Sequence, residues 1–253
     1  VNLRKSGLIA IILREDDELV SVELTDGNRE LLLGSREPLT FLERQDNQPM
    51  EDGDEWLDWL VSLRDRLLDL LRDRSLSLKD RLRNFLLITG EAQQLLDSEN
   101  MAELAAFCTE SWVISTKTDA GSGSWEAAAC RCLQDLEILE PDWLALLKQW
   151  AQAPELPGFA PQDPEKLERI AVYFAFRYLL KAVNDGDLLG RAQFCALGVL
   201  VTDRLSRFVG LPEALRLFSR EIEHNEENLG TLLEQFWQTE GLSLSALLAA
   251  FGG

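Results

Sequence analysis

From residue 54 onward, apolar residues recur at helical spacing and polar residues fill the positions between them. In "DEWLDWLVSLRDRLLDLLRDRS" (54–75), tryptophan and leucine side chains form one stripe and arginine and aspartate lie opposite. This spacing is typical of an amphipathic helix. The same pattern predicts helices over 77–96, with Ser77 as its N-cap, and over 99–115, 125–139, 141–153, 165–183, 188–209, 211–238 and 243–251. We therefore predict a helical domain over residues 55–253.

The first part of the chain follows a different pattern, which is typical of strands. An apolar run from Leu8 to Leu13 is followed by alternating apolar and polar residues, and Asp26 and Gly27 form a hairpin turn signal. We predict a β meander over 1–42 and a polar linker over 43–54, which contains proline and glycine. The predicted fold class is mainly α, a multi-helix bundle with a small N-terminal β meander.

Charge and cysteine content narrow the classes of partner and compartment. The 253-residue chain has a formal net charge of -19, which repels the phosphates of nucleic acids and anionic lipids. No apolar run approaches the roughly 20 residues that a membrane span needs. Four cysteines in a chain of this length indicate free thiols rather than a disulfide framework. We expect a cytoplasmic protein that binds neither nucleic acid nor membrane.

The only histidine of the chain, His224, lies in the acidic stretch "SREIEHNEENL". Glu221 precedes it by three residues, a spacing by which helical bundles present a carboxylate and an imidazole to one metal ion. A symmetric two-metal site is impossible with one histidine, and we assign no metal site. Two interpretations stay open: a mixed site that adds Asp185, Asp187 or Glu168, and the solvated face of a helix.

A second group of polar residues surrounds an aromatic helix. In "YFAFRY" (173–178), Arg177 lies among residues typical of a core, and an unpaired buried charge is costly. We expect this arginine to pair with Glu221, Glu223 or Asp187. The following "NDGD" turn is interpreted as helix punctuation, with Asp187 as the cap of the next helix. As an alternative, Asp185 and Asp187 present carboxylates at one end of the bundle.

The stretch "DAGSGS" (119–124) is similar to the glycine-rich loops of nucleotide and S-adenosylmethionine sites. Such a loop works when it follows a buried strand and begins a helix. The polar residues "STKT" precede it here, so we interpret it as a flexible connection between helices.

Several of these segments resemble one protein family. "YFAFRYLLKAVNDGDLLGRAQFCALGVLV" and "FSREIEHNEENLGTLLEQF" resemble the C-terminal helical half of the flagellin lysine-N-methylases, and the resemblance covers roughly residues 36–240. It implies an enzyme that methylates lysine side chains of flagellin, with S-adenosylmethionine as the methyl donor. The positions that match are candidate catalytic residues, Glu221, His224, Asp185 and Asp187, and candidate substrate-binding residues, Tyr173, Arg177, Glu223 and Asn228.

These residue types suit that chemistry. Methyl transfer to lysine requires a neutral amine, which a neighbouring carboxylate or imidazole can produce. An acidic pocket lined by aromatic rings also suits a cationic lysine.

The sequence departs from the family in one respect. Members begin with a cysteine-rich segment, whereas residues 3–35 resemble one blade of the C-terminal domain of the DNA gyrase A protein. This departure leaves open whether the chain alone is catalytic. The first functional hypothesis is a flagellin lysine methyltransferase. The second is a non-catalytic helical module that binds flagellin or another partner through its acidic surface. A gyrase-like DNA-binding element is the third.

Overall fold

The computed structural model describes residues 53–114, 125–156 and 158–252. The predicted β meander over 1–42, nearly all of the linker over 43–54 and the glycine-rich stretch over 119–124 lie outside the described residues. Their structure, and with it the predicted domain boundaries, stays a prediction. Residues Trp56–Gly253 belong to one compact unit, and the description that follows concerns this helical unit.

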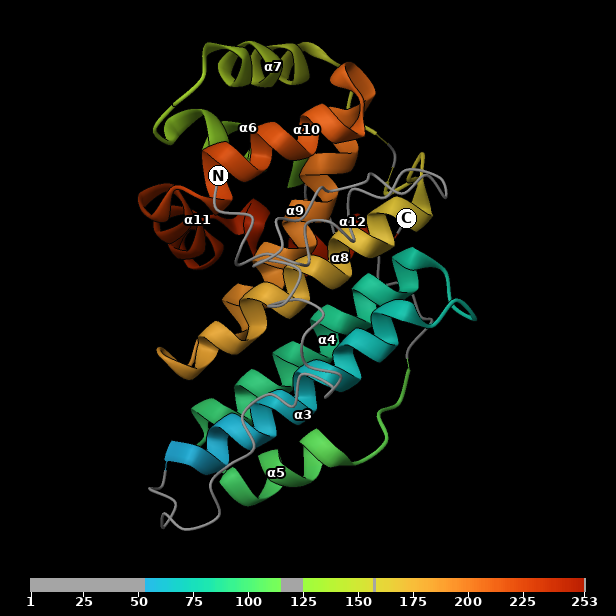
Figure 1. Cartoon of the computed structure of the whole chain (residues 1–253), viewed down its shortest axis with the longest axis vertical. Helices are drawn as coiled ribbons and strands as arrows, with labels where there is room; N and C mark the ends of the chain where they lie inside the picture. Colours follow the sequence, from blue (N-terminus) through green and yellow to red (C-terminus); the bar gives the residue numbers. More distant parts are fainter. Residues whose placement is uncertain (1–52, 115–124, 157, 253) are drawn as a thin grey trace, which may run out of the picture. The chain divides into compact units, whose positions relative to one another are not determined.

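The prediction of a mainly α fold is confirmed. The described residues form ten α-helices (Figure 1). Their bounds are α3 Gly53–Arg72, α4 Leu78–Asp97, α5 Met101–Thr109, α6 Trp125–Asp135, α7 Pro141–Gln152, α8 Pro164–Tyr178, α9 Leu188–Val209, α10 Leu211–Phe218, α11 Glu226–Gln238 and α12 Leu244–Ala250. Two short 3-10 helices cover Leu179–Val183 and Glu240–Leu242, and a π-helical turn covers Ser219–Glu223.

Helix α9 lies at the centre of this unit, with α4, α8 and α10 packed against it. Apolar residues occur around its whole circumference, as expected for a helix that is buried on all sides. Gly198 allows its close approach to α8, because a Cβ atom there would lie 2.8 Å from the ring of Phe174. That ring belongs to a buried aromatic cluster with Tyr178, Phe194 and Phe218. No described helix is long and apolar enough to span a bilayer.

Local sequence signals explain several helix ends. The Ser77 hydroxyl accepts a hydrogen bond from the Asp80 amide, so the predicted N-cap of α4 is confirmed. Pro141 occupies the first turn of α7, where the missing amide costs nothing. Asp187 caps α9, again as predicted, by accepting from the amide of Gly190. The turn before this cap requires the positive φ of 71° at Gly186.

Several predicted helices are shorter or interrupted in the structure, and the one predicted over 125–139 ends at Asp135. The helix predicted over 211–238 was wrong in its continuity, because a π-helical turn and Asn225 divide it into α10 and α11. The Asn225 side chain accepts from the amides of Glu227 and Asn228, which starts a new helix. The helix predicted over 165–183 changes to 3-10 geometry after Tyr178, and the helix predicted over 99–115 ends at Thr109.

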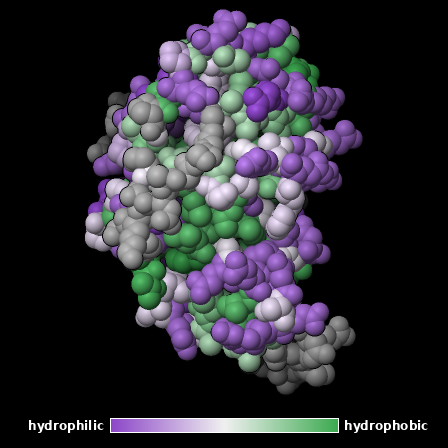
Figure 2. Space-filling view, turned by 180° about the vertical axis from the view of Figure 1, so that it is seen from behind, coloured by the Kyte–Doolittle hydropathy of each residue, from purple (hydrophilic) through white to green (hydrophobic). Residues whose placement is uncertain are grey.

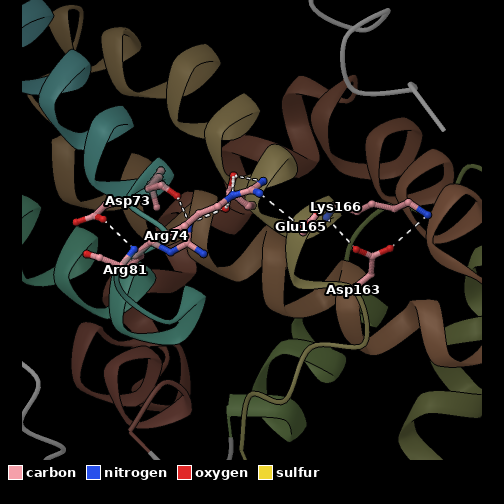
Figure 3. A network of polar contacts seen from close by, with 9 residues as sticks. Asp73, Arg74, Arg81, Asp163, Glu165 and Lys166 are labelled. Atoms are coloured by element: carbon pink, nitrogen blue, oxygen red, sulfur yellow. Dashed lines mark hydrogen bonds and ion pairs between the residues drawn. The ribbon is translucent and has the colours of Figure 1, made fainter. Parts of the chain in front are cut away.

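An ion-pair network joins α4 and the connection between α3 and α4 to α8 (Figure 3). Arg81 donates to the carboxylate of Glu168 at 2.7 Å and to the carbonyl of Leu71 at 2.6 Å, and Arg74 donates to the same carboxylate. Burial raises the pKa of Glu168, but the hydrogen bonds from the two arginines outweigh it and leave that pKa lowered. Glu168 therefore has a structural role here, and the two arginines occupy the carboxylate that a mixed metal site would use.

Candidate functional site

One group of buried and half-buried side chains consists of Tyr173, Arg177, Tyr178 and Glu223. We call it the closed carboxylate centre. The Glu223 side chain is 1% exposed, and its Oε1 accepts from the hydroxyls of Tyr173 at 3.2 Å and Tyr178 at 3.0 Å. Arg177 Nε lies 3.8 Å from the same oxygen, and its Nη1 donates to Tyr173. Glu223 is thus one of the three carboxylates that we expected as a partner for Arg177.

The electrostatics of this centre keep both hydroxyls protonated. Burial and, next, the charge of Glu223 raise the pKa of Tyr173 to about 12 and also raise the pKa of Tyr178. Lys181 lies over the Tyr178 ring at 4.8 Å, and burial together with the charges of Arg177 and Arg191 lowers its pKa. The tyrosines therefore serve as permanent donors to Glu223 near neutral pH.

Glu221 and Asn228 form a second group, which holds the connection between α6 and α7. Glu221 is fully buried, and its two oxygens accept from the amides of Leu139 at 2.9 Å and Glu140 at 2.7 Å. The Asn228 side chain accepts from the amide of Glu137 and donates to its carbonyl and to that of Glu221. These two side chains thus give the connection the hydrogen bonds that its own backbone does not make.

The remaining candidates are His224, which follows the π-helical turn, and Asp185 and Asp187, which precede α9. His224 follows the π-helical turn, is exposed, and has no hydrogen-bond partner for its imidazole in the described part of the chain. An exposed His224 is what the interpretation as a solvated helix face expects, whereas Glu221 on the same stretch is buried. Asp185 pairs with Arg191 at 2.5 Å, and burial raises the pKa of the capping Asp187. In the part of the chain that the structure describes, no hydrogen bond or ion pair joins Asp187 to Glu221.

The side chains singled out by the resemblance do not form an open binding site together. Glu221, Glu223 and Asn228 direct their polar atoms at internal partners. As arranged, these residues do not fit S-adenosylmethionine, which needs exposed donors and acceptors for its adenosine and amino-acid groups. We derive no reaction step through this cofactor. The residues described here also contain no group of three metal-ligating side chains.

An open cleft of about 460 Å³ lies elsewhere, between α4 and the end of α5. One wall is a stripe of α4, since Asn84, Leu87, Ile88 and Glu91 follow helical spacing. The other wall is formed by Phe107, Glu110, Ser111, Trp112 and Val113. We call it the α4–α5 cleft. It combines apolar and aromatic surface with two carboxylates, the residue types that bind a long cationic side chain.

Exposed apolar surface continues at this cleft. Val113 is 94% exposed, and Ile114 beside it is also exposed. On the face drawn in Figure 2, hydrophilic residues cover much of the surface and hydrophobic residues gather in one area between them. Large apolar side chains that are exposed to solvent next to a cleft are typical of an interaction site.

This cleft could not be predicted, because the helix predicted over 99–115 places Trp112 and Val113 on a regular helix surface. The chain leaves the helix after Thr109, and Arg66 from α3 contacts the segment that follows. The one local signal was the apolar "WVI" directly after "TES", and the contact across more than 40 residues leaves no local trace.

The four cysteines, Cys108, Cys130, Cys132 and Cys195, are buried free thiols. The expectation of free thiols is therefore consistent with the structure. Burial raises the pKa of Cys108 and of Cys132 to about 11. A high pKa and low exposure make them inert in the folded protein.

Comparison with known proteins shows a short likeness. A 40-residue stretch, 16% of this chain, is 56% identical to the DNA gyrase A protein of Haloquadratum walsbyi and covers 5% of that protein. This agrees with the predicted gyrase resemblance at the level of a fragment. No family model matches the chain, and no solved structure matches it. The resemblance to flagellin lysine-N-methylases therefore stays a prediction, and what these comparisons establish is a similarity to a small part of the gyrase A protein.

Proposed function

We propose that the helical unit binds a partner protein through the α4–α5 cleft, and that the bound segment carries lysine beside apolar side chains. The observation that carries this proposal is the lining of the cleft. Phe107 and Trp112 offer aromatic surface, while Glu91 and Glu110 supply negative charge at the same cleft. Flagellin is the partner that the resemblance implies.

Both parts of a lysine side chain, the aliphatic stem and the ammonium group, match this lining. Its aliphatic stem packs against apolar surface while its ammonium group stays in water near a carboxylate. The net charge of -19 adds a long-range attraction for basic segments, which increases the rate of association at low salt. An acidic segment would meet repulsion at the same cleft.

A pair of synthetic peptides tests this proposal. One alternates leucine and lysine, and the other has glutamate in place of lysine. Fluorescence anisotropy should detect binding of the lysine peptide alone. Replacing a buried aromatic anchor typically costs about 2 kcal/mol, roughly a 30-fold loss of affinity. We expect a loss of this size for Trp112→Ala.

The matched control is Trp237→Ala, because Trp237 is 64% exposed and lies outside the cleft lining. Equal losses for the two tryptophan variants, or equal binding of both peptides, would reject the cleft as the binding site. Purified flagellin is then measured in the same way, which decides whether it is the partner.

Methylation of the bound lysine is the second candidate function. The resemblance over residues 36–240 favours it, and so does an acidic, aromatic cleft, which suits a cationic lysine before the reaction. A transfer assay with flagellin and a labelled methyl donor tests it. Incorporation into lysine that Trp112→Ala lowers and Trp237→Ala leaves unchanged would support methylation. No incorporation by a chain that binds flagellin would reject methylation and leave the binding function.

A further inference from the structure

Arg66 of α3 makes an unusual set of contacts behind the α4–α5 cleft. Its Nη1 donates to the carbonyls of Phe107 at 3.3 Å and Cys108 at 2.6 Å, and its Nη2 donates to the carbonyl of Glu110. Its guanidinium carbon lies 3.8 Å from the centre of the Trp112 ring. One side chain therefore contacts four residues of the segment 107–112.

These contacts compensate for the unpaired carbonyls and the missing positive charge at the C-terminal end of α5. The last carbonyls of a helix have no partner within the helix. Helix α5 has nine residues and no basic residue in its last turn, so it is short for a helix and lacks the usual cation at its negative end. Arg66 supplies both the donors and the positive charge from a distant part of the chain.

The same guanidinium also orients the indole. Trp112 Nε1 donates to the carbonyl of Phe107 at 3.0 Å, the carbonyl that Arg66 also reaches. The ring is thus fixed at its edge by this hydrogen bond and on one face by the stacked arginine. Phe107 lies beside it, with 6.0 Å between the ring centroids. The aromatic wall of the cleft is therefore assembled around Arg66.

We infer that Arg66 is the positioning residue of the α4–α5 cleft: it fixes the aromatic wall and thereby determines the affinity for the bound segment. This inference rests on the proposed function. A planar fork with several donors is needed, because the carbonyls and the indole must be contacted together. Lysine has the charge but not this geometry, so Arg66→Lys should behave as a loss of function.

The accessibility of the Cys108 thiol can show whether the aromatic wall of the cleft is in place. Cys108 is fully buried directly behind it, and its own carbonyl accepts from Arg66. When the wall opens, this thiol becomes accessible to an alkylating reagent. Cys195 is also buried but belongs to the central helix α9, so it reports on opening of the core instead.

The experiment compares Arg66→Gln and Arg66→Lys with the wild type, and Arg72→Gln is the matched control on the exposed surface of α3. Iodoacetamide labelling of Cys108 and Cys195 is followed by peptide mapping. Affinity for the leucine–lysine peptide is measured on the same samples. We expect both Arg66 variants to label Cys108 roughly tenfold faster, with Cys195 unchanged, if one charged hydrogen bond sets the opening equilibrium. We expect affinity to fall by a similar factor.

Unchanged Cys108 labelling would overturn the inference, and so would faster labelling with unchanged affinity, since Arg66 would then only stabilise α5. Faster labelling of both cysteines would also overturn it, because the whole core would then have loosened. Failure of the wild type to bind the peptide is a different result. It rejects the proposed function, while Cys108 labelling still shows whether Arg66 holds the wall.

Discussion

The closed carboxylate centre and the α4–α5 cleft are built from the same residue types but differ in how their polar atoms are used. In the centre, Glu223 is enclosed by two tyrosines and Arg177, and its charge is balanced inside the protein. At the cleft, Glu91 and Glu110 are exposed beside Phe107 and Trp112. Aromatic and acidic residues together do not by themselves indicate a binding site. Carboxylates that are exposed to solvent beside aromatic rings do indicate such a site.

The largest effect should follow from removing a buried carboxylate near the closed centre. Glu221→Ala leaves the amides of Leu139 and Glu140 without their acceptors. Each stranded donor costs about 1–3 kcal/mol, so we expect the free energy of unfolding to fall by about 3 kcal/mol or more. Urea denaturation measures this. Glu234→Ala, an exposed position on α11, is the control, and a comparable loss there would remove the distinction between buried and exposed carboxylates.

High pH should weaken the closed centre next. The chain has two tyrosines, and both donate to Glu223. The pKa of Tyr173 is raised from 10.0 to about 12 in the folded protein. Its contribution is therefore complete below pH 10 and is lost as the pH rises from about 10 to about 12. We expect a loss of roughly 2 kcal/mol over this window in urea denaturation.

Near-ultraviolet absorbance of tyrosinate gives an independent check. It should stay low at pH 10 in the folded protein and rise when urea is added at that pH. Half-ionised tyrosine in the folded protein at pH 10 would show that the hydroxyls are not held by Glu223.

The smallest effect should come from His224. Its imidazole is exposed and makes no hydrogen bond to the described residues, so His224→Ala should change the free energy of unfolding by less than about 0.5 kcal/mol. Thermal or urea denaturation with the wild type alongside is sufficient. A loss above about 1 kcal/mol would indicate a paired imidazole and would extend the closed centre to this residue.

Local signals in the sequence predicted much of the helical unit. Ser77 and Asp187 are short polar residues directly before apolar helical patterns, and both cap helices as expected. The break at Asn225 was not predicted, because the flanking residues keep helical spacing and the π-helical turn absorbs one residue. That turn lets Glu221 and Glu223, two positions apart, be buried toward different partners.

The arrangement of the candidate residues could be predicted only in part. The need of Arg177 for a carboxylate follows from burial, and the pairing with Glu223 meets it. Which carboxylate it is depends on the packing of α8 against the π-helical turn, which helical spacing does not encode. The cleft depends even more on distant contacts, since Arg66 and Trp112 are 46 positions apart in the sequence.

The most direct test of the account exchanges one carboxylate in each region for its amide. Glu91→Gln should weaken the leucine–lysine peptide roughly fivefold and leave the free energy of unfolding within about 0.5 kcal/mol of the wild type. Glu223→Gln should leave the affinity unchanged and lower the free energy of unfolding by about 2 kcal/mol. Both quantities are measured on both variants. The opposite pattern, with binding lost through Glu223 and unaffected by Glu91, would contradict the account and place the functional site at the closed carboxylate centre.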